Sequence, residues 1–134
     1  MDYVSAKMFL KLSDSKQQSI LEWWYPKLGD FAFIYNADLN EFESEFYIVQ
    51  SKSFDHGDFD TDKGKLRVLP LLRQKQLFDY IESKVGKFDI NYDSSCGYVF
   101  VIYLGNFSAG NFIEVTHKHD MTEALLALTN KLEV

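Results

Sequence analysis

The sequence has little cysteine and no long apolar run. Cys96 is its only cysteine, so an internal disulfide bond is impossible and a reducing compartment is indicated. The longest apolar run, from Tyr98 to Leu104, is far shorter than the roughly 20 residues of a membrane-spanning helix. The first residues also lack the basic start and apolar centre of a signal peptide. We therefore expect a cytoplasmic protein with no membrane partner.

Positive charge is scarce as well. The chain holds 14 Lys and Arg residues against 20 Asp and Glu residues, which gives a net charge of −6. Such a chain is repelled by phosphate backbones, which argues against nucleic-acid binding. Residues 38–62 concentrate the negative charge, with eight acidic side chains and one basic side chain. This acidic stretch is a candidate surface for meeting a basic partner.

Recognised catalytic motifs are absent from the sequence. Gly105 and Gly110 meet neither nucleotide-binding glycine pattern, and no nucleophile elbow or paired-cysteine zinc motif occurs. Nothing around Cys96 activates a thiol, and a lone cysteine before an apolar strand usually packs in a core. We therefore expect no enzyme activity and no cofactor.

The composition and the apolar periodicity predict one α+β domain spanning residues 1–134. Apolar side chains make up 46% of the 134 residues, enough to bury a core without disulfides or metal. The expected helices are 4–12, 15–25, 70–85 and 120–132. The expected strands are 31–35, 46–50, 88–92, 98–104 and 112–117. Short connections favour an antiparallel sheet of about five strands with helices on one face, in the order ααββαβββα.

The last two helices have clear end signals. Pro70 suits the first position of the third helix, and Gly86 suits the position just beyond its end. Asp120 and Glu123 form a capping box at the start of the last helix. The expected buried stripe of this helix is Met121, Leu125, Leu128 and Leu132. The strand from Tyr98 is apolar on both faces, so it is expected in the centre of the sheet, with a turn at residues 105–111.

The second helix carries the pair Trp23 and Trp24. A capping box at Ser15–Gln18 starts this helix, whose apolar face is Ile20, Leu21 and Trp24. Adjacent helical residues point about 100° apart, so Trp23 lies off that face. We expect Trp24 in the core, whereas Trp23 either covers the edge of the sheet or anchors a partner.

An alternative function is metal binding by the acidic loop predicted at residues 51–65. Asp58, Asp60 and Asp62 alternate there as the oxygen donors of a calcium loop do. However, Lys63 stands where such a loop needs glycine, and the bidentate glutamate expected at the twelfth position is missing.

A second candidate metal site contains histidines. His117 and His119 are separated by one residue at a strand end, so both imidazoles can point the same way, as a zinc site requires. His56 joins them only if the fold brings it close. A small metal-binding protein or metal-dependent enzyme is therefore the alternative to a binding protein.

Several segments resemble a loose group of small proteins encoded by phages and prophages. These segments are Gln17–Asp30 with its Trp23-Trp24-x-Pro26-x-x-Gly29 pattern, Leu69–Leu77, Gly97–Tyr103 and Thr122–Leu128. They cover much of the chain in the right order, while the acidic stretch 38–62 is poorly matched. The resemblance implies an accessory protein of a mobile element, with no activity and no catalytic residues to carry over.

These observations favour a non-catalytic module that binds a host or phage protein. The residues expected to contact the partner are Asp55, Asp58, Asp60, Asp62 and Trp23. A structural part of a larger assembly, including a homo-oligomer, is the remaining hypothesis.

Overall fold

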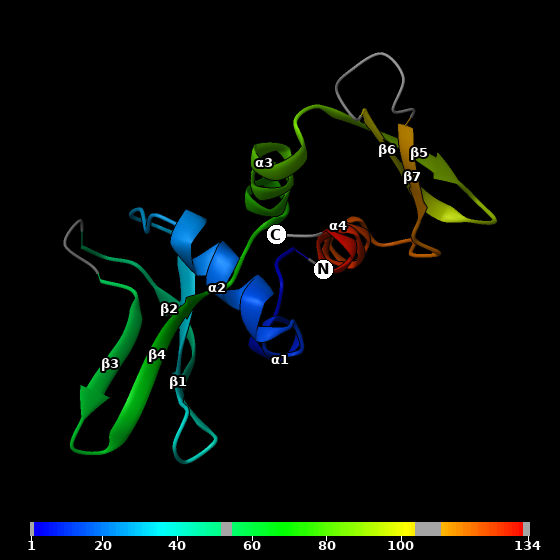
Figure 1. The fold of residues 1–134 in the computed structure, drawn as a ribbon. Coiled ribbons are helices and arrows are strands. Elements are labelled where there is room, and N and C mark those ends of the chain that lie inside the picture. The colour runs from blue at the N-terminus through cyan, green and yellow to red at the C-terminus, as the bar shows by residue number, and fades with distance from the viewer. Residues whose placement is uncertain (1, 52–54, 104–110, 133–134) are drawn as a thin grey trace. The chain divides into compact units, whose positions relative to one another are not determined.

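The computed structural model describes residues 2–51, 55–103 and 111–132, which form helices and antiparallel strands (Figure 1). The helices are α1 (Ala6–Leu10), α2 (Asp14–Trp23), α3 (Gln74–Val85) and α4 (Met121–Lys131). The strands are β1 (Phe31–Asn36), β2 (Glu41–Ile48), β3 (Gly57–Thr61), β4 (Gly64–Pro70), β5 (Phe88–Asp93), β6 (Gly97–Tyr103) and β7 (Asn111–Val115). The predicted α+β class and the antiparallel pairing are confirmed.

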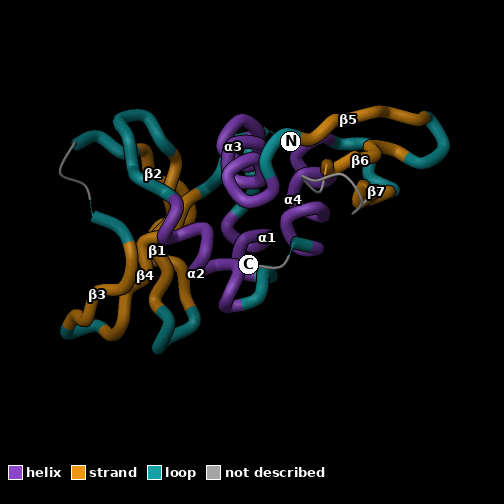
Figure 2. Tube along the Cα trace, turned by 45° about the horizontal axis from the view of Figure 1, so that its top comes forward, coloured by secondary structure: helices purple, strands orange, loops and turns teal. Residues whose placement is uncertain are grey.

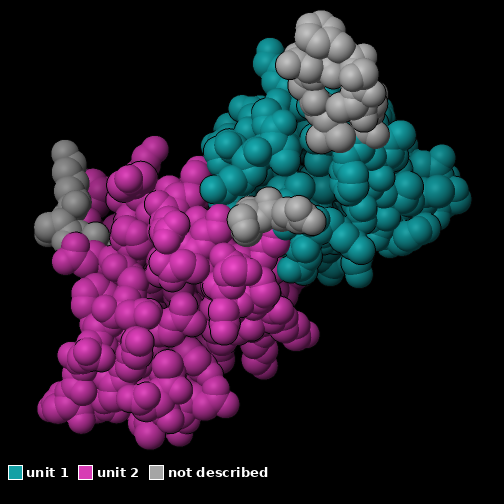
Figure 3. All heavy atoms as spheres, viewed as in Figure 1, with its two compact units in different colours: residues 1–4, 73–134 teal, residues 5–72 magenta. Residues whose placement is uncertain are grey.

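The chain divides into two compact units (Figure 3). Each unit has its own sheet. Unit 2 is Ser5–Leu72, with a four-stranded sheet, and unit 1 is Met1–Val4 together with Arg73–Val134, with a three-stranded sheet. Two sheets therefore replace the one sheet of about five strands that the periodicity predicts, because periodicity locates strands without choosing their neighbours. That all 134 residues fold as one domain stays a prediction.

In unit 2 the strand order is β2-β1-β4-β3, and every neighbouring pair is antiparallel. The predicted hairpin of the first two strands is confirmed, although β2 begins at Glu41, earlier than expected. Its register against β1 shifts twice, between Ala32 and Ile34 and between Ile34 and Tyr35. The register of β4 against β1 has no such shift. The inner strands β1 and β4 thus form the regular centre of this sheet.

The prediction of a surface loop at residues 51–65 is wrong, because this segment contains all of β3 and the first residues of β4. Aspartate is uncommon in strands, which hides the hairpin from the periodicity. Here Asp58 pairs with Arg67 and Asp60 with Lys65 across the two strands, while Phe59 pairs with Leu66. Opposite charges on one face and apolar side chains on the other stabilise such a hairpin.

The predicted start of the third helix at Pro70 is also wrong. Pro70 is the last residue of β4 and pairs with Ala32, and α3 begins only at Gln74. The N–H of Arg73, the residue before the helix, donates to the side chain of Gln76 at 2.9 Å. A proline that fits the first turn of a helix fits the end of a strand equally well, since neither position requires its missing N–H.

Asn36 ties the two hairpin turns of unit 2 together. Its fully buried side chain accepts hydrogen bonds from the N–H groups of Asp38 and Leu39 and donates to the carbonyl of Lys63 at 3.1 Å. The Lys63 turn belongs to the β3–β4 hairpin, and the other two residues belong to the β1–β2 turn. A single buried amide thereby satisfies backbone groups from two segments that lie 27 positions apart.

The helices of unit 2 pack on the sheet face that carries Phe33. Phe9 of α1 meets the Phe33 ring edge-on at 5.8 Å between ring centres. Of the apolar face predicted for the second helix, Ile20 and Leu21 are buried on α2, and Trp24 is buried just after the helix ends. The predicted capping box at Ser15–Gln18 is wrong, because the cap is Ser13, two residues earlier, whose hydroxyl accepts the N–H of Lys16.

In unit 1 the strand order is β5-β6-β7, so the strand beginning at Gly97 is central, as predicted (Figure 2). Phe78 of α3 stacks on Phe88 at 4.7 Å between ring centres, and Phe88 meets Phe100 at 6.0 Å. The helices thus cover the face that carries these rings. The turn predicted at residues 105–111 falls almost entirely outside the described residues.

The last helix confirms its sequence signals. The Asp120 carboxylate accepts the N–H of Glu123 at 3.0 Å and caps α4. That hydrogen bond is the largest of the influences that lower the pKa of Asp120 below its ordinary value. Leu125, Leu128 and Leu132 are buried as predicted, whereas Met121, the fourth member of the predicted stripe, is half-buried. This helix is therefore held by a charged cap at one end and an apolar face along its length.

Candidate functional site

An open cleft of about 530 Å³ lies within unit 2, between the first turns of α2 and the β3–β4 hairpin. Its main lining residues are Asp14, Ser15 and Gln18 of the helix, and Asp58, Lys65 and Arg67 of the hairpin. Charged groups of both signs therefore face the same hollow.

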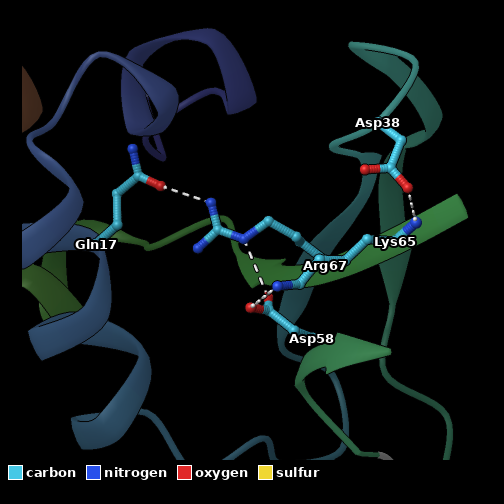
Figure 4. Close-up of polar contacts among 5 residues, drawn as sticks. All are labelled: Gln17, Asp38, Asp58, Lys65 and Arg67. Atoms are coloured by element: carbon cyan, nitrogen blue, oxygen red, sulfur yellow. Dashed lines mark hydrogen bonds and ion pairs between the residues drawn. The ribbon is translucent and has the colours of Figure 1, made fainter. Parts of the chain in front are cut away.

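Arg67 is held in one position at the cleft by two hydrogen bonds (Figure 4). Its Nε donates to Asp58 Oδ1 at 3.0 Å, and one terminal nitrogen donates to Gln17 Oε1 at 3.2 Å. The arginine side chain is 21% exposed and the aspartate side chain 40% exposed. The guanidinium is consequently ordered by its neighbours while part of it still meets solvent.

Gln17 is the least expected member of the site. Its side chain is only 3% exposed, and its amide nitrogen donates to the carbonyls of Leu12 at 2.9 Å and Leu10 at 3.3 Å. These carbonyls lie at the end of α1 and in its connection to α2. The amide oxygen is left to accept from Arg67, so the junction of the two helices positions the guanidinium.

Lys65 completes the charged hairpin face. Its ammonium lies 3.6 Å from the second oxygen of Asp58, and its backbone N–H donates to Asp38 Oδ2 at 2.9 Å (Figure 4). Asp58 therefore interacts with two cations, and the pairs are partly exposed. Exposed pairs of this kind contribute little to stability, of the order of 0–1 kcal/mol each. The arrangement organises the surface more than it stabilises the fold.

The four predicted acidic contact residues do not act as one cluster. Asp58 and Asp60 lie on the same face of β3, Asp62 lies in the β3–β4 turn, and Asp55 precedes the strand. All four are exposed. Because β3 is extended, alternate residues are roughly 7 Å apart and do not curl around a cation as a calcium loop does. Their role in binding a partner stays a prediction.

The histidines show no zinc-site arrangement among the described residues either. The backbone of His117 has φ 55°, so the strand alternation that predicts parallel imidazoles ends before it. His119 Nδ1 hydrogen-bonds the Tyr92 hydroxyl at 2.9 Å. His56 instead packs on the Trp24 ring at 5.3 Å and bonds the Leu21 carbonyl at 3.2 Å. Within residues 2–51, 55–103 and 111–132, no group of three or more His, Cys, Asp or Glu side chains is placed to hold a metal ion.

The tryptophans differ as predicted. Trp24 is 2% exposed, and its indole N–H donates to the buried carboxylate of Asp30 at 3.1 Å. Trp23 is half-buried. The core position of Trp24 is confirmed, and a contact of Trp23 with a partner stays a prediction.

Cys96 lies in a turn organised by a carboxylate. Asp93 accepts hydrogen bonds from the hydroxyl and N–H of Ser95 and from the N–H of Cys96, and these bonds, with the Ser95 hydroxyl foremost, lower the pKa of Asp93. The thiol lies 3.6 Å from the Ser95 hydroxyl. This contact supplies no base, so it is not an arrangement that activates a nucleophile.

The sequence reasoning missed Gln17, Lys65 and Arg67. A signal for the last two is present: Asp58-x-Asp60 and Lys65-x-Arg67 flank a short turn with matching alternation, which is typical of a hairpin with paired charges. Compared with known proteins, the chain matches no family model, no curated protein and no solved structure. Among the described helices, none combines the length and apolar character needed to cross a bilayer.

Proposed function

We propose that this chain is a non-catalytic accessory protein that binds another protein through the cleft of unit 2. The observation that supports this most is the fixed guanidinium of Arg67, held by the buried Gln17 and by Asp58 at an open hollow. In this proposal the protein acts in the cytoplasm and belongs to the mobile-element type that the sequence resembles.

An ordered arginine is well suited to be the centre of an interface. A guanidinium has five N–H donors, and the contacts to Asp58 and Gln17 engage two of them among the described residues. Arginine is enriched among residues that carry most of the binding energy of interfaces. Because its side chain is already ordered, binding loses less conformational entropy than it does at a mobile arginine.

The charges around the cleft define the partner's surface. Lys65 and Arg67 favour a carboxylate or a carbonyl on the partner, while Asp14 favours a basic group beside it. The partner therefore presents groups of both signs rather than a purely basic patch. Asp55, Asp60 and Asp62 act mainly as rim charges that steer the encounter, over about 8 Å at physiological salt.

The test compares Arg67→Gln with Lys7→Gln, which removes one positive charge from an exposed position of α1. The wild-type chain is immobilised to capture a partner from a cell extract, and rate constants are then measured for each purified pair. We expect Arg67→Gln to weaken binding by about tenfold or more, mainly through faster dissociation, and Lys7→Gln to leave it unchanged.

A second variant separates steering from anchoring. Replacing Asp60 and Asp62 by Asn slows association and reduces its salt dependence, while dissociation stays the same. Circular dichroism melting of every variant controls for folding. Equal affinity of the wild type and Arg67→Gln for the captured partner would show that the cleft is not the binding surface.

A further inference from the structure

The sheet of unit 1 has one face without helices among the described residues. Phe88 pairs with Ile102, and α3 and α4 pack on the face of these two side chains. Side chains alternate along strands, so the residues between them point to the other face. The apolar members of that second face are Val99 and Val101 of β6 and Ile113 and Val115 of β7.

This second face continues to the edge of the sheet at β7. Ile113 is 60% exposed and Val115 is 40% exposed, both high values for β-branched apolar side chains in a strand. Within the described part of the chain, β6 is the one strand that pairs with β7, so its other side is a free edge. An apolar face and a free edge thus meet along the same residues.

Among the described residues, the other three free edges carry features by which proteins prevent strand pairing. Charged side chains and bulges are two such features. The acidic side chains on those edges are Glu41, Glu43 and Glu45 on β2, Asp58 and Asp60 on β3, and Asp89 and Asp93 on β5. The register of β2 is also shifted twice, whereas the register of β7 against β6 is uninterrupted. On β7 the only charged residue is Glu114, which is half-buried on the helix-covered face.

The hydrogen bonds of the neighbouring segment show which backbone groups face outward. The N–H of Thr116 donates to the Tyr98 carbonyl at 3.1 Å. Because bonding direction alternates along an antiparallel strand, Glu114 also bonds towards β6, while Ile113 and Val115 direct their N–H and C=O groups to the free edge. Only another extended backbone supplies donors and acceptors at the spacing of these outward N–H and C=O groups.

We propose that β7 is a docking edge that adds an extended segment of another protein as a fourth strand. The segment has β-branched or other apolar residues at alternate positions, which extend the face of Val101 and Ile113. Between them it has a Lys or Arg, which lies beside Glu114 on the opposite face. This surface belongs to unit 1 and is independent of the cleft proposed above.

A second copy of this chain fits the edge less well. Antiparallel self-pairing about Ile113 places Glu114 opposite Phe112 instead of a basic residue. It also brings together two chains that each carry a net charge of −6. The charge on the edge therefore favours a basic partner segment over a copy of the chain.

The test uses a capped five-residue peptide in which valine alternates with lysine and threonine. One control peptide carries N-methyl groups on the amides that would bond to β7. The other control peptide has glutamate in place of lysine. Binding is followed by the hydrogen exchange of the full chain, read at the amides of Ile113 and Val115. We expect the first peptide to slow exchange at both amides by tenfold or more at saturation. The N-methylated peptide has no effect, and the glutamate peptide binds more weakly.

Two variants locate the binding. Ile113→Lys puts a charge on the edge and abolishes the protection, whereas the matched variant Asn91→Lys, on the exposed β5 edge, keeps it. Arg67→Gln leaves peptide binding unchanged, so failure of the cleft and failure of the edge are distinguishable. The proposal is overturned if 1 mM peptide gives no protection or if the N-methylated peptide binds equally. It is also overturned if sedimentation shows a dimer that Ile113→Lys dissociates, since the occupant is then a second copy.

Discussion

The outer strands β3 of unit 2 and β7 of unit 1 differ in their charge. In unit 2 the outer strands carry carboxylates, and those of β3 face Lys65 and Arg67 across the hairpin. In unit 1 the outer strand β7 is mostly apolar, and its register is uninterrupted. The carboxylates of a charged strand are stabilised by opposite charges on the neighbouring strand, whereas an apolar edge strand can still pair with a further strand. The comparison shows why unit 2 offers a polar cleft and unit 1 offers a strand edge.

The largest effect we expect is from Leu125→Ala in α4 of unit 1. The side chain is 1% exposed, and its removal leaves a cavity, so the free energy of unfolding falls by about 2–5 kcal/mol. Urea denaturation measures the loss. Hydrogen exchange of the same variant then tests whether the two units form one domain. If they do, amides of β1 and β4 lose protection together with those of β6, and if only unit 1 loses protection, the one-domain prediction is wrong.

Gly97→Ala probes the turn before the central strand of unit 1. Its φ of 74° is left-handed, and an added Cβ would lie 2.2 Å from the carbonyl oxygen of Lys118. We expect a loss of about 3 kcal/mol, because the strain and a clash with backbone act together. In unit 2, Gly29→Ala at φ 88° meets no atom within 4 Å and costs about 1 kcal/mol from strain alone. Equal losses in the two variants would mean that the Lys118 backbone moves freely.

The helix caps of the two units respond differently to pH. Asp120 caps α4 and Ser13 caps α2, so Asp120→Ala and Ser13→Ala each lower the free energy of unfolding by about 0.5–2 kcal/mol at pH 7. The folded state lowers the pKa of Asp120, chiefly through the Glu123 N–H. Its contribution is therefore present above the unfolded pKa, near about 4, and is lost as pH falls through the folded value.

Urea denaturation at pH 7 and pH 3 checks this difference. The difference in the free energy of unfolding between the wild type and Asp120→Ala becomes smaller at the lower pH. The corresponding difference for Ser13→Ala stays constant. A gap for Asp120→Ala that stays constant down to pH 2 would contradict an ionised cap.

The smallest effect we expect is from Asp58→Asn in unit 2. Its carboxylate is 40% exposed, and solvent screens both of its ion pairs, so the free energy of unfolding changes by less than about 1 kcal/mol. We expect the proposed binding at the cleft to suffer more than stability, because the hydrogen bond that Arg67 donates to residue 58 loses its charge assistance. A stability loss above about 2 kcal/mol would show that the charged face of the hairpin holds the sheet together.

The parts of the fold that the sequence predicted are those decided by neighbouring residues. The Asp120 cap, the buried stripe of α4 and the core position of Trp24 each follow from residues within a few positions along one helix. The β3–β4 hairpin was missed because Asp58 and Asp60 are poor strand formers by themselves. Their stabilising partners stand on the next strand, which periodicity within a single segment does not reveal.

By itself, the sequence determined the α+β class, the antiparallel pairing of short strands and the start of its last helix. Only the tertiary structure decided that the strands divide into two sheets and that Gln17 meets Arg67, fifty positions away. Local hydrogen bonds and side-chain periodicity act over a few residues, so the sequence displays them directly. Contacts between distant residues depend on sheet register and helix packing. Sequences with the same periodicity can differ in both, so periodicity alone does not predict these contacts.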